Sequence, residues 1–440
     1  MQMITASQLE ELVLTQKEWF RTRDPGIPRR IVTGPLIQTD EVVVITGIRR
    51  CGKSTLLRQL SGLYSDYQYV NFDDDRLMDF TVADFPALML VFEKTLPGVK
   101  TLFVDEIQNV IGWERFVRRI HDEGYKVFLT GSSASLISSE LGTRLTGRYI
   151  PVILYPFSFA EALQFRSIDT GRITETKKAQ ILSEFDRYLA GGGFPDFIKY
   201  QDPEYLKRIY DDVLYRDIIS RLGIREVKGF RQLARYIFSN MANPATYNAL
   251  KKTLGFKSVT SVRDYVGFLE EVYLVFEICR YDFSLKKQYV SEKKLYCIDT
   301  GMRNAVAFRF SGDTGRLLEN CILIELLRRK KSVYFFRNHR ECDFVTEEEG
   351  VITGAIQVCF ELTPENRERE IGGLTSAMAA HGLSEGRLIT CCQEKTFTQD
   401  GRIIHVLPAW KWLLESEANS PQKPGQKTTP PGAKGRGKQK

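Results

Sequence analysis

A glycine-rich segment near the N-terminus has the composition of a phosphate-binding loop. It matches the pattern GxxxxGK[ST] with the residues Gly47, Ile48, Arg49, Arg50, Cys51, Gly52, Lys53, Ser54 and Thr55. Glycines let the backbone N–H groups of such a loop turn inward around phosphates, and Lys53 would bring a positive charge to the β- and γ-phosphates. The Ser54 hydroxyl can ligate Mg²⁺, and the positive end of a following helix favours the anion. The segment therefore predicts a site for ATP and Mg²⁺.

Two further groups of residues could act on a bound triphosphate. Asp105 and Glu106 directly follow an apolar run at residues 101–104. We expect Asp105 to hold the metal through water and Glu106, as the catalytic residue, to polarise the water that attacks the γ-phosphate. Ser132 and Ser133 follow another apolar run, and either could orient that water or contact the γ-phosphate. Together these residues predict ATP hydrolysis, with Lys53, Glu106 and Ser132 as catalytic candidates.

A parallel sheet is the element that would bring these residues together. Residues 41–46 form a short, almost continuous apolar run, as expected of a strand that is buried on both faces. Residues 53–63 carry leucines at helical spacing. Further strand-like runs alternate with helical patterns at residues 67–72, 101–104, 126–130 and 149–154. This alternation predicts an α/β, doubly wound P-loop core over residues 28–160, with its ligand at the carboxyl ends of the strands.

The rest of the chain divides into five segments by pattern and composition. We predict an N-terminal helix in residues 1–27, a helical lid in 161–226, a winged-helix-like unit in 227–290, an α/β domain in 291–416 and a disordered basic tail in 417–440.

Charge and hydropathy limit the binding partners and the cellular compartments that we expect for the protein. The net charge is +7, but residues 416–440 hold six basic residues and one acid, so the body is nearly neutral. This argues against a uniformly basic protein, although a local basic face remains possible, and the tail itself could hold nucleic acid nonspecifically. No apolar run approaches the roughly 18 residues that span a bilayer, and no signal peptide is evident. None of the eight cysteines forms a CxxC pair. We expect a cytoplasmic protein with reduced thiols and no membrane partner.

The spacing of the first three groups resembles that of the AAA-type ATPases of the AAA+ superfamily. The segments NFDDD at 71–75, GSSAS at 131–135 and GGFP at 192–195 are similar to a prokaryotic subgroup that joins an AAA-type module to a C-terminal domain of uncharacterised function. The similarity covers about residues 20–410.

The resemblance implies a homo-oligomer in which an arginine of one subunit reaches the γ-phosphate bound by its neighbour. Arg148 is the first choice for this catalytic role and Arg144 the second, because both lie between the expected fourth and fifth strands. Arg216 is a candidate lid arginine.

Residues 228–290 have the pattern of a winged helix-turn-helix. Residues 261–269 would be the recognition helix, and residues 274–281 and 293–298 would be wing strands. Four lysines are expected around the wing tip: Lys286, Lys287, Lys293 and Lys294. Basic wing residues suit DNA phosphates, but winged helices also bind proteins, so both roles stay open.

Residues 315–410 resemble a restriction-endonuclease-like domain. Such sites need carboxylates around a divalent metal and a lysine nearby; Glu319, Asp343 and Gln357 fit, but Cys359 stands where the lysine is expected. We therefore expect a degenerate fold kept for binding or scaffolding, and nuclease activity is the less favoured alternative.

For the whole chain, the leading hypothesis is an ATPase that couples Mg²⁺-ATP binding and hydrolysis to conformational change and associates with DNA. The alternative is a nucleotide-dependent protein-interaction or signalling switch with slow turnover and no role for DNA.

Overall fold

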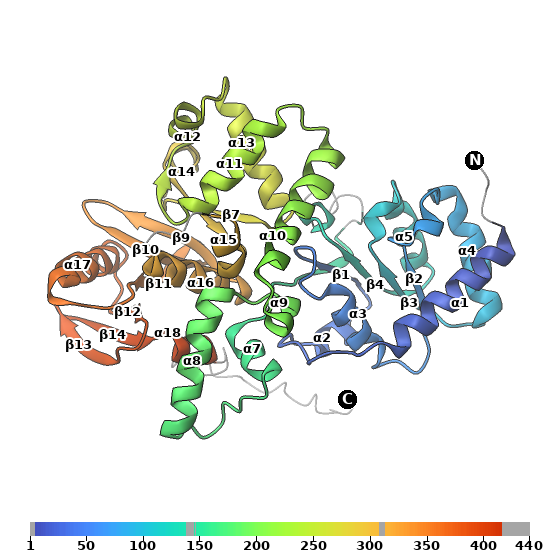
Figure 1. Cartoon of the computed structure of the whole chain (residues 1–440), viewed down its shortest axis with the longest axis horizontal. Coiled ribbons are helices and arrows are strands. Elements are labelled where there is room, and N and C mark those ends of the chain that lie inside the picture. The colour runs from blue at the N-terminus through green and yellow to red at the C-terminus, as the bar shows by residue number, and fades with distance from the viewer. Residues whose placement is uncertain (1–4, 138–144, 146, 308–312, 416–440) are drawn as a thin grey trace, which may run out of the picture.

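The computed structural model describes residues 5–137, 145, 147–307 and 313–415 (Figure 1). The predictions for Arg144 and for the tail at 417–440 lie outside these residues. Among the described residues, none of the helices combines the length and the apolar character that crossing a membrane requires.

The N-terminal part contains the predicted parallel sheet. Its five strands run in the order β2-β3-β4-β1-β5, and every neighbouring pair is parallel. All five residues of β1 are buried, which explains why this strand is apolar throughout. The strands are β1 (Val42–Thr46), β2 (Gln68–Asn71), β3 (Thr101–Asp105), β4 (Lys126–Gly131) and β5 (Tyr149–Ile153).

Two layers of helices cover this sheet. Val43 and Ile45 of β1 pack in one core with the leucines of α3, whereas Val42 and Val44 pack in a second core with side chains of α1, α4 and α5. Alternate residues of a strand point to opposite faces, so β1 anchors both layers. The helices are α1 (Ala6–Thr22), α2 (Gly34–Gln38), α3 (Lys53–Ser61), α4 (Phe85–Thr95) and α5 (Trp113–Asp122), with short 3₁₀ turns η1 (Asp75–Leu77), η2 (Val82–Asp84), η3 (Ile107–Asn109) and η4 (Ala134–Ile137).

A helical segment follows and fastens the sheet to the rest of the chain. Its turn at residues 191–195 needs glycine, because a Cβ on Gly192 (φ +75°) would lie 2.0 Å from Asp299 Oδ1. The Gly193 N–H also donates to Asp299 Oδ2 at 2.7 Å. The segment contains α7 (Phe159–Phe165), α8 (Glu175–Gly191), α9 (Pro195–Tyr200), α10 (Pro203–Asp212) and the π-helix η5 (Val213–Ser220).

The middle unit, residues 227–297, combines helices with a three-stranded sheet in the order β6-β8-β7. It contains α11 (Val227–Ser239), β6 (Pro244–Ala245), α12 (Tyr247–Leu254), α13 (Val259–Glu271), β7 (Val275–Cys279), α14 (Leu285–Val290) and β8 (Lys293–Cys297). The expectation that Lys293 and Lys294 lie at an exposed wing tip is wrong. All of β8 is buried, and these two side chains are only 4% and 1% exposed.

The C-terminal unit, residues 300–414, is built on a six-stranded sheet in the order β13-β14-β12-β11-β10-β9. The β9-β10-β11 pairs are antiparallel, whereas β12 is parallel to both β11 and β14. Helices α16 and α17 pack with opposite faces of this sheet. The elements are α15 (Thr300–Val306), α16 (Thr314–Arg328), β9 (Ser332–Arg337), β10 (Glu341–Glu348), β11 (Val351–Val358), α17 (Pro364–Ala380), β12 (Glu385–Thr390), β13 (Lys395–Gln399), β14 (Arg402–Pro408) and α18 (Ala409–Leu414).

Candidate nucleotide-binding site

The glycine-rich loop joins β1 to α3 and has the backbone that its sequence predicts. A Cβ on Gly47 would fall 2.1 Å from the carbonyl oxygen of Leu154, so only glycine fits against the end of the neighbouring strand. Arg50 (φ +67°) and Gly52 (φ +102°) are both left-handed. Alternation with left-handed residues turns successive N–H groups toward one side of the chain, which makes a concave anion-binding surface.

Lys53 lies inside this loop. Its ammonium donates to the carbonyl oxygens of Gly47 at 3.1 Å and Ile48 at 3.2 Å, and its side chain is buried. These bonds hold the positive charge at the place where the loop and the start of α3 meet. Phosphate oxygens would compete for the same ammonium with a full negative charge.

Asp105 is the last residue of β3, and Glu106 follows it directly. Asp105 is buried and accepts hydrogen bonds from the hydroxyls of Thr130 and Ser54, while the Glu106 N–H donates to Thr130 Oγ1 at 3.0 Å. Burial, with the charge of Glu106, raises the pKa of Asp105 to about 6. Glu106 has φ +52°, a left-handed conformation that costs an L-residue roughly 1–2 kcal/mol. Such strain gathers at functional sites.

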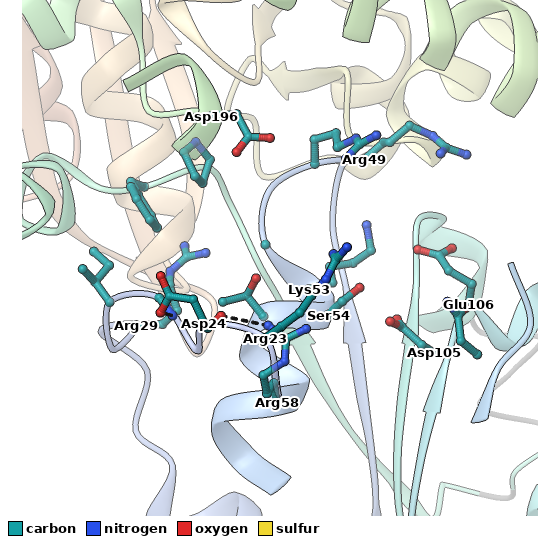
Figure 2. A pocket seen from close by; sticks show the side chains of 18 of the residues that line it. Arg23, Asp24, Arg29, Arg49, Lys53, Ser54, Arg58, Asp105, Glu106 and Asp196 are labelled. Carbon is teal, nitrogen blue, oxygen red and sulfur yellow. Dashed lines mark hydrogen bonds between the residues drawn. The ribbon is translucent and has the colours of Figure 1, made fainter. Parts of the chain in front are cut away.

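One cleft of about 490 Å³ contains the loop and the acidic pair. In Figure 2, Lys53 and Ser54 lie between Asp105 and Glu106 on one side and Arg29 and Asp24 on the other. Seven basic and five acidic side chains line the cleft, and the basic excess suits a polyphosphate. Its apolar lining, which suits a planar base, comes from Trp19, Ile27, Phe157, Phe165 and Pro195.

The described residues include no cluster of three or more histidine, cysteine, aspartate or glutamate side chains arranged to hold a metal. Ser54 and Asp105 nevertheless offer one hydroxyl and one carboxylate within hydrogen-bonding distance. Such an oxygen pair fits Mg²⁺, which keeps several waters and takes its other ligands from nucleotide phosphates. These two residues would hold the metal, which would supply charge neutralisation at the phosphates.

Arg29 supports the loop, although no sequence pattern identifies it. Its guanidinium donates to the Cys51 carbonyl at 2.9 Å, to the Tyr155 carbonyl at 2.7 Å and to Glu161 at 2.8 Å. Burial opposes ionisation of Glu161, but Arg29 and then Arg328 outweigh it and lower the pKa of this carboxyl to about 2. Arg29 therefore links the phosphate-binding loop to Glu161 of α7, which lies 132 residues further along the chain.

Two contacts lead from the cleft to other parts of the chain. Arg49, in the loop, makes a two-bond ion pair with Asp217 of the π-helix η5 at 3.1 and 3.2 Å. At the end of β4, Ser133 Oγ donates to Glu271 of α13 at 3.3 Å, and Arg221 donates to the same carboxylate at 3.1 Å.

The remaining predicted residues occupy different places. Ser132 is buried just beyond β4. Its neighbour Ser133 makes the hydrogen bond to Glu271 of α13. Arg148 is half-exposed, pairs with Asp122 and lies beside the start of β1, since the Val42 N–H donates to its carbonyl. The four residue steps of β1, at roughly 3.3 Å each, therefore place Arg148 about 13 Å from the end of that strand where the loop begins. Arg216 is exposed and is not part of the cleft lining.

Comparison with known proteins gives two matches to protein families and two to curated relatives. Residues 39–163 match an AAA domain family, and residues 182–313 match a domain of unknown function. An uncharacterised protein of Methanocaldococcus jannaschii, MJ1544, is 34% identical over 397 residues, covering 85% of this chain and 88% of its own. An uncharacterised protein of Haemophilus influenzae is 29% identical over 352 residues, which cover 74% of this chain and 84% of that protein.

Solved structures resemble the chain only distantly. The crystal structure of Cdc6p from Pyrobaculum aerophilum covers 68% of this chain and 92% of its own at 14% identity. The TM-score of this pair is 0.23.

Proposed function

This chain belongs to the family of the M. jannaschii protein and carries an AAA domain, and from that premise we propose that it binds and hydrolyses Mg²⁺-ATP and transmits the nucleotide state to its middle unit. The observation that carries the proposal is the single cleft that contains Lys53, Ser54, Asp105 and Glu106. The loop amides and Lys53 bind the phosphates, Ser54 and Asp105 hold the metal, and Glu106 orients the attacking water.

The test of binding is a comparison of lysine variants. Lys53→Ala should abolish measurable ATP binding in a fluorescent-nucleotide titration with Mg²⁺, because the ammonium in the loop is lost. Lys100→Ala is the matched control, since Lys100 is exposed and bonds to the Glu123 carbonyl outside the cleft. Equal affinity of both variants for ATP would contradict the proposal.

The contacts of Arg49 and Ser133 support the coupling. Thr46, the last residue before the loop, donates to the Ser133 carbonyl at 2.8 Å. The Arg49–Asp217 and Ser133–Glu271 contacts therefore start from the ends of two adjacent strands, β1 and β4. A γ-phosphate near Arg49 would compete with Asp217 for the guanidinium, because both are anions that a planar fork can bind. Loss of this pair would release the middle of η5 from the loop, and π-helical turns are frequent at functional sites.

A double-mutant cycle tests this coupling. Asp217→Asn should change the Kd for ATP at least fivefold, the lower end of typical coupling between sites. The change should disappear in the Arg49→Ala background, because the two side chains act as one pair. Additive effects on Kd would show that the pair does not report the nucleotide.

The surface of the middle unit favours the alternative in which ATP controls contact with a protein. Two of the four expected wing lysines are buried, and the exposed side chains of α13 include both Arg263 and Asp264, whose charges cancel. Exposed apolar side chains lie at and beside α14: Phe283 (88%), Leu285 (67%), Tyr289 (76%) and Val290 (74%). Single apolar side chains on a surface are normal, but a group of this kind is typical of protein contacts.

Binding and turnover assays with duplex DNA distinguish the DNA-associated ATPase from the nucleotide-dependent protein-interaction switch. We expect fluorescence anisotropy at low salt to detect no binding that depends on Lys286 and Lys287, and ATPase turnover to be the same with and without DNA. DNA binding whose affinity falls steeply with salt and is lost in Lys286→Ala/Lys287→Ala would instead support the DNA-associated ATPase.

A further inference from the structure

The C-terminal unit contains a buried group of charges that the nucleotide cleft does not use. Asp343 of β10 and Gln357 of β11 are adjacent: the Asp343 N–H donates to Gln357 Oε1 at 3.3 Å, and the Val358 N–H donates to Asp343 Oδ2 at 3.0 Å. Glu319 of α16 lies against the same place, since both its carboxylate and that of Asp343 contact one ammonium. The three residues that the sequence singles out therefore meet.

The ammonium at this place belongs to Lys294 of β8, in the middle unit. Its Nζ lies 3.0 Å from Glu319 Oε1, 2.8 Å from Glu341 Oε1 and 3.1 Å from Asp343 Oδ1. The side chain is 1% exposed. The ammonium is therefore fully enclosed by protein and held by three carboxylates.

Cys359 does not share this role. It stands where a lysine is expected, and a thiol has no cationic form that could supply the charge of that lysine. Lys294, 65 residues earlier in the chain, supplies the positive charge from a different strand and a different sheet.

Neutralising one buried lysine does not require the three carboxylates that surround Lys294. One carboxylate neutralises one lysine, as the part-buried Glu277 does for the neighbouring Lys293 at 3.8 Å. Lys294 instead faces three carboxylates, one of which, Glu341, also lies 3.8 Å from Arg337 Nε, and such a set of converging oxygens is the ligand type of a divalent ion. The three oxygens surround one point at 2.8–3.1 Å, and a metal ion at that point would need each to move inward by roughly 0.5–1 Å.

We propose that Lys294 is the resident cation of a latent metal site: its ammonium takes the position of a divalent ion among Glu319, Glu341 and Asp343, and its removal converts the group into a divalent-metal site. In the native chain the ammonium excludes the metal by occupancy and by charge. The C-terminal unit accordingly lacks the metal that nucleic-acid cleavage at these carboxylates requires.

The test is Mn²⁺ titration of the full-length, nucleotide-free protein, followed by electron paramagnetic resonance of the free ion. Asp105→Asn serves as the parent, because it removes a candidate metal ligand from the nucleotide cleft. Adding Lys294→Met should create one site with at least tenfold tighter Mn²⁺ binding than in the parent, and Glu319→Gln should remove that site. Lys293→Met is the matched control: it removes a buried lysine from the same strand and should leave Mn²⁺ binding as in the parent.

Three results would overturn the proposal. They are no added Mn²⁺ site in folded Lys294→Met protein, an equal site in Lys293→Met, and Mn²⁺ binding by the parent that Glu319→Gln abolishes. If Lys294→Met folds only when Mn²⁺ is present, as circular dichroism would show, the metal has replaced the ammonium and the proposal is supported. If it folds under neither condition, the parent titration decides: Mn²⁺ binding unchanged by Glu319→Gln supports the resident ammonium, and Glu319-dependent binding refutes it.

Discussion

The buried Arg29–Glu161 pair gives a sharp prediction for Glu161→Gln. Glu161 is 2% exposed, and among the residues that the structure describes its carboxylate is the only acidic group that forms an ion pair with Arg29, whose guanidinium holds the Cys51 carbonyl. Glutamine keeps the size and one acceptor oxygen of the side chain but removes the charge. The substitution therefore leaves Arg29 as a buried cation with a weaker partner.

The size of the effect follows from the pKa of Glu161. The difference between the ordinary value of 4.5 and about 2 in the folded protein corresponds to about 3 kcal/mol, at roughly 1.36 kcal/mol per unit. Because the folded-state pKa is the lower one, this stabilisation is fully present above pH 4.5 and is lost as the pH falls toward 2. The same linkage leaves roughly half of it at pH 3.

Urea unfolding of variant and parent at pH 7 and pH 3 measures this difference. Glu161→Gln should lower the free energy of unfolding by about 3 kcal/mol at pH 7, and the gap should shrink by about half at pH 3. Glu123→Gln is the control, because it breaks the exposed Arg119–Glu123 pair and should cost only about 0.3–0.5 kcal/mol. A gap for Glu161→Gln that is below 1 kcal/mol at pH 7, or that does not change with pH, would refute the reasoning.

Three further predictions concern separate parts of the chain. Gly192→Ala should lower the free energy of unfolding by about 2 kcal/mol or more, whereas Gly223→Ala, also at positive φ but with open space around the added methyl, should cost about 1 kcal/mol; denaturation curves that coincide would contradict this. Arg148→Ala should slow ATP turnover at least tenfold with unchanged Kd for ATP if the arginine acts on a neighbouring subunit, and light scattering must then show an oligomer. Lys294→Met should lower the free energy of unfolding by about 3–5 kcal/mol without metal, because it leaves buried carboxylates unpaired; a thermal melt identical to that of the parent would contradict it.

The nucleotide-binding part was predictable because its signals are local. The strand β1, the loop and the first turn of α3 lie within 20 consecutive residues, and the apolar run, the glycines and the leucines each indicate one element. Helix α5 is local in the same way, because its apolar side chains repeat at helical spacing between Gly112 and the turn after Asp122. Even here the sequence could not choose between Ser132 and Ser133, since only the path of the chain after β4 decides that Ser133 reaches Glu271 of α13.

The residues that support the site could not be predicted, because their partners are distant in sequence. Arg29 and Glu161 look like ordinary charged residues until the fold joins them, and the same holds for Arg49 and Asp217. Lys294 shows the limit most clearly. Its pattern, a lysine beside another lysine near an expected wing, indicates an exposed basic tip, but the pairing of β8 with both β6 and β7 buries it among carboxylates of the next unit.

Glu106→Gln provides the most direct test of the central claim, that one cleft binds Mg²⁺-ATP and hydrolyses it. The measurement is a single-turnover assay with radiolabelled ATP that reports bound nucleotide and released phosphate from the same sample. Wild-type protein should bind ATP and release phosphate, while Glu106→Gln should bind ATP with similar affinity and release phosphate at least a hundredfold more slowly, since its water is no longer polarised. Turnover by Glu106→Gln at the wild-type rate, or wild-type protein without affinity for ATP in the presence of Mg²⁺, would contradict the account.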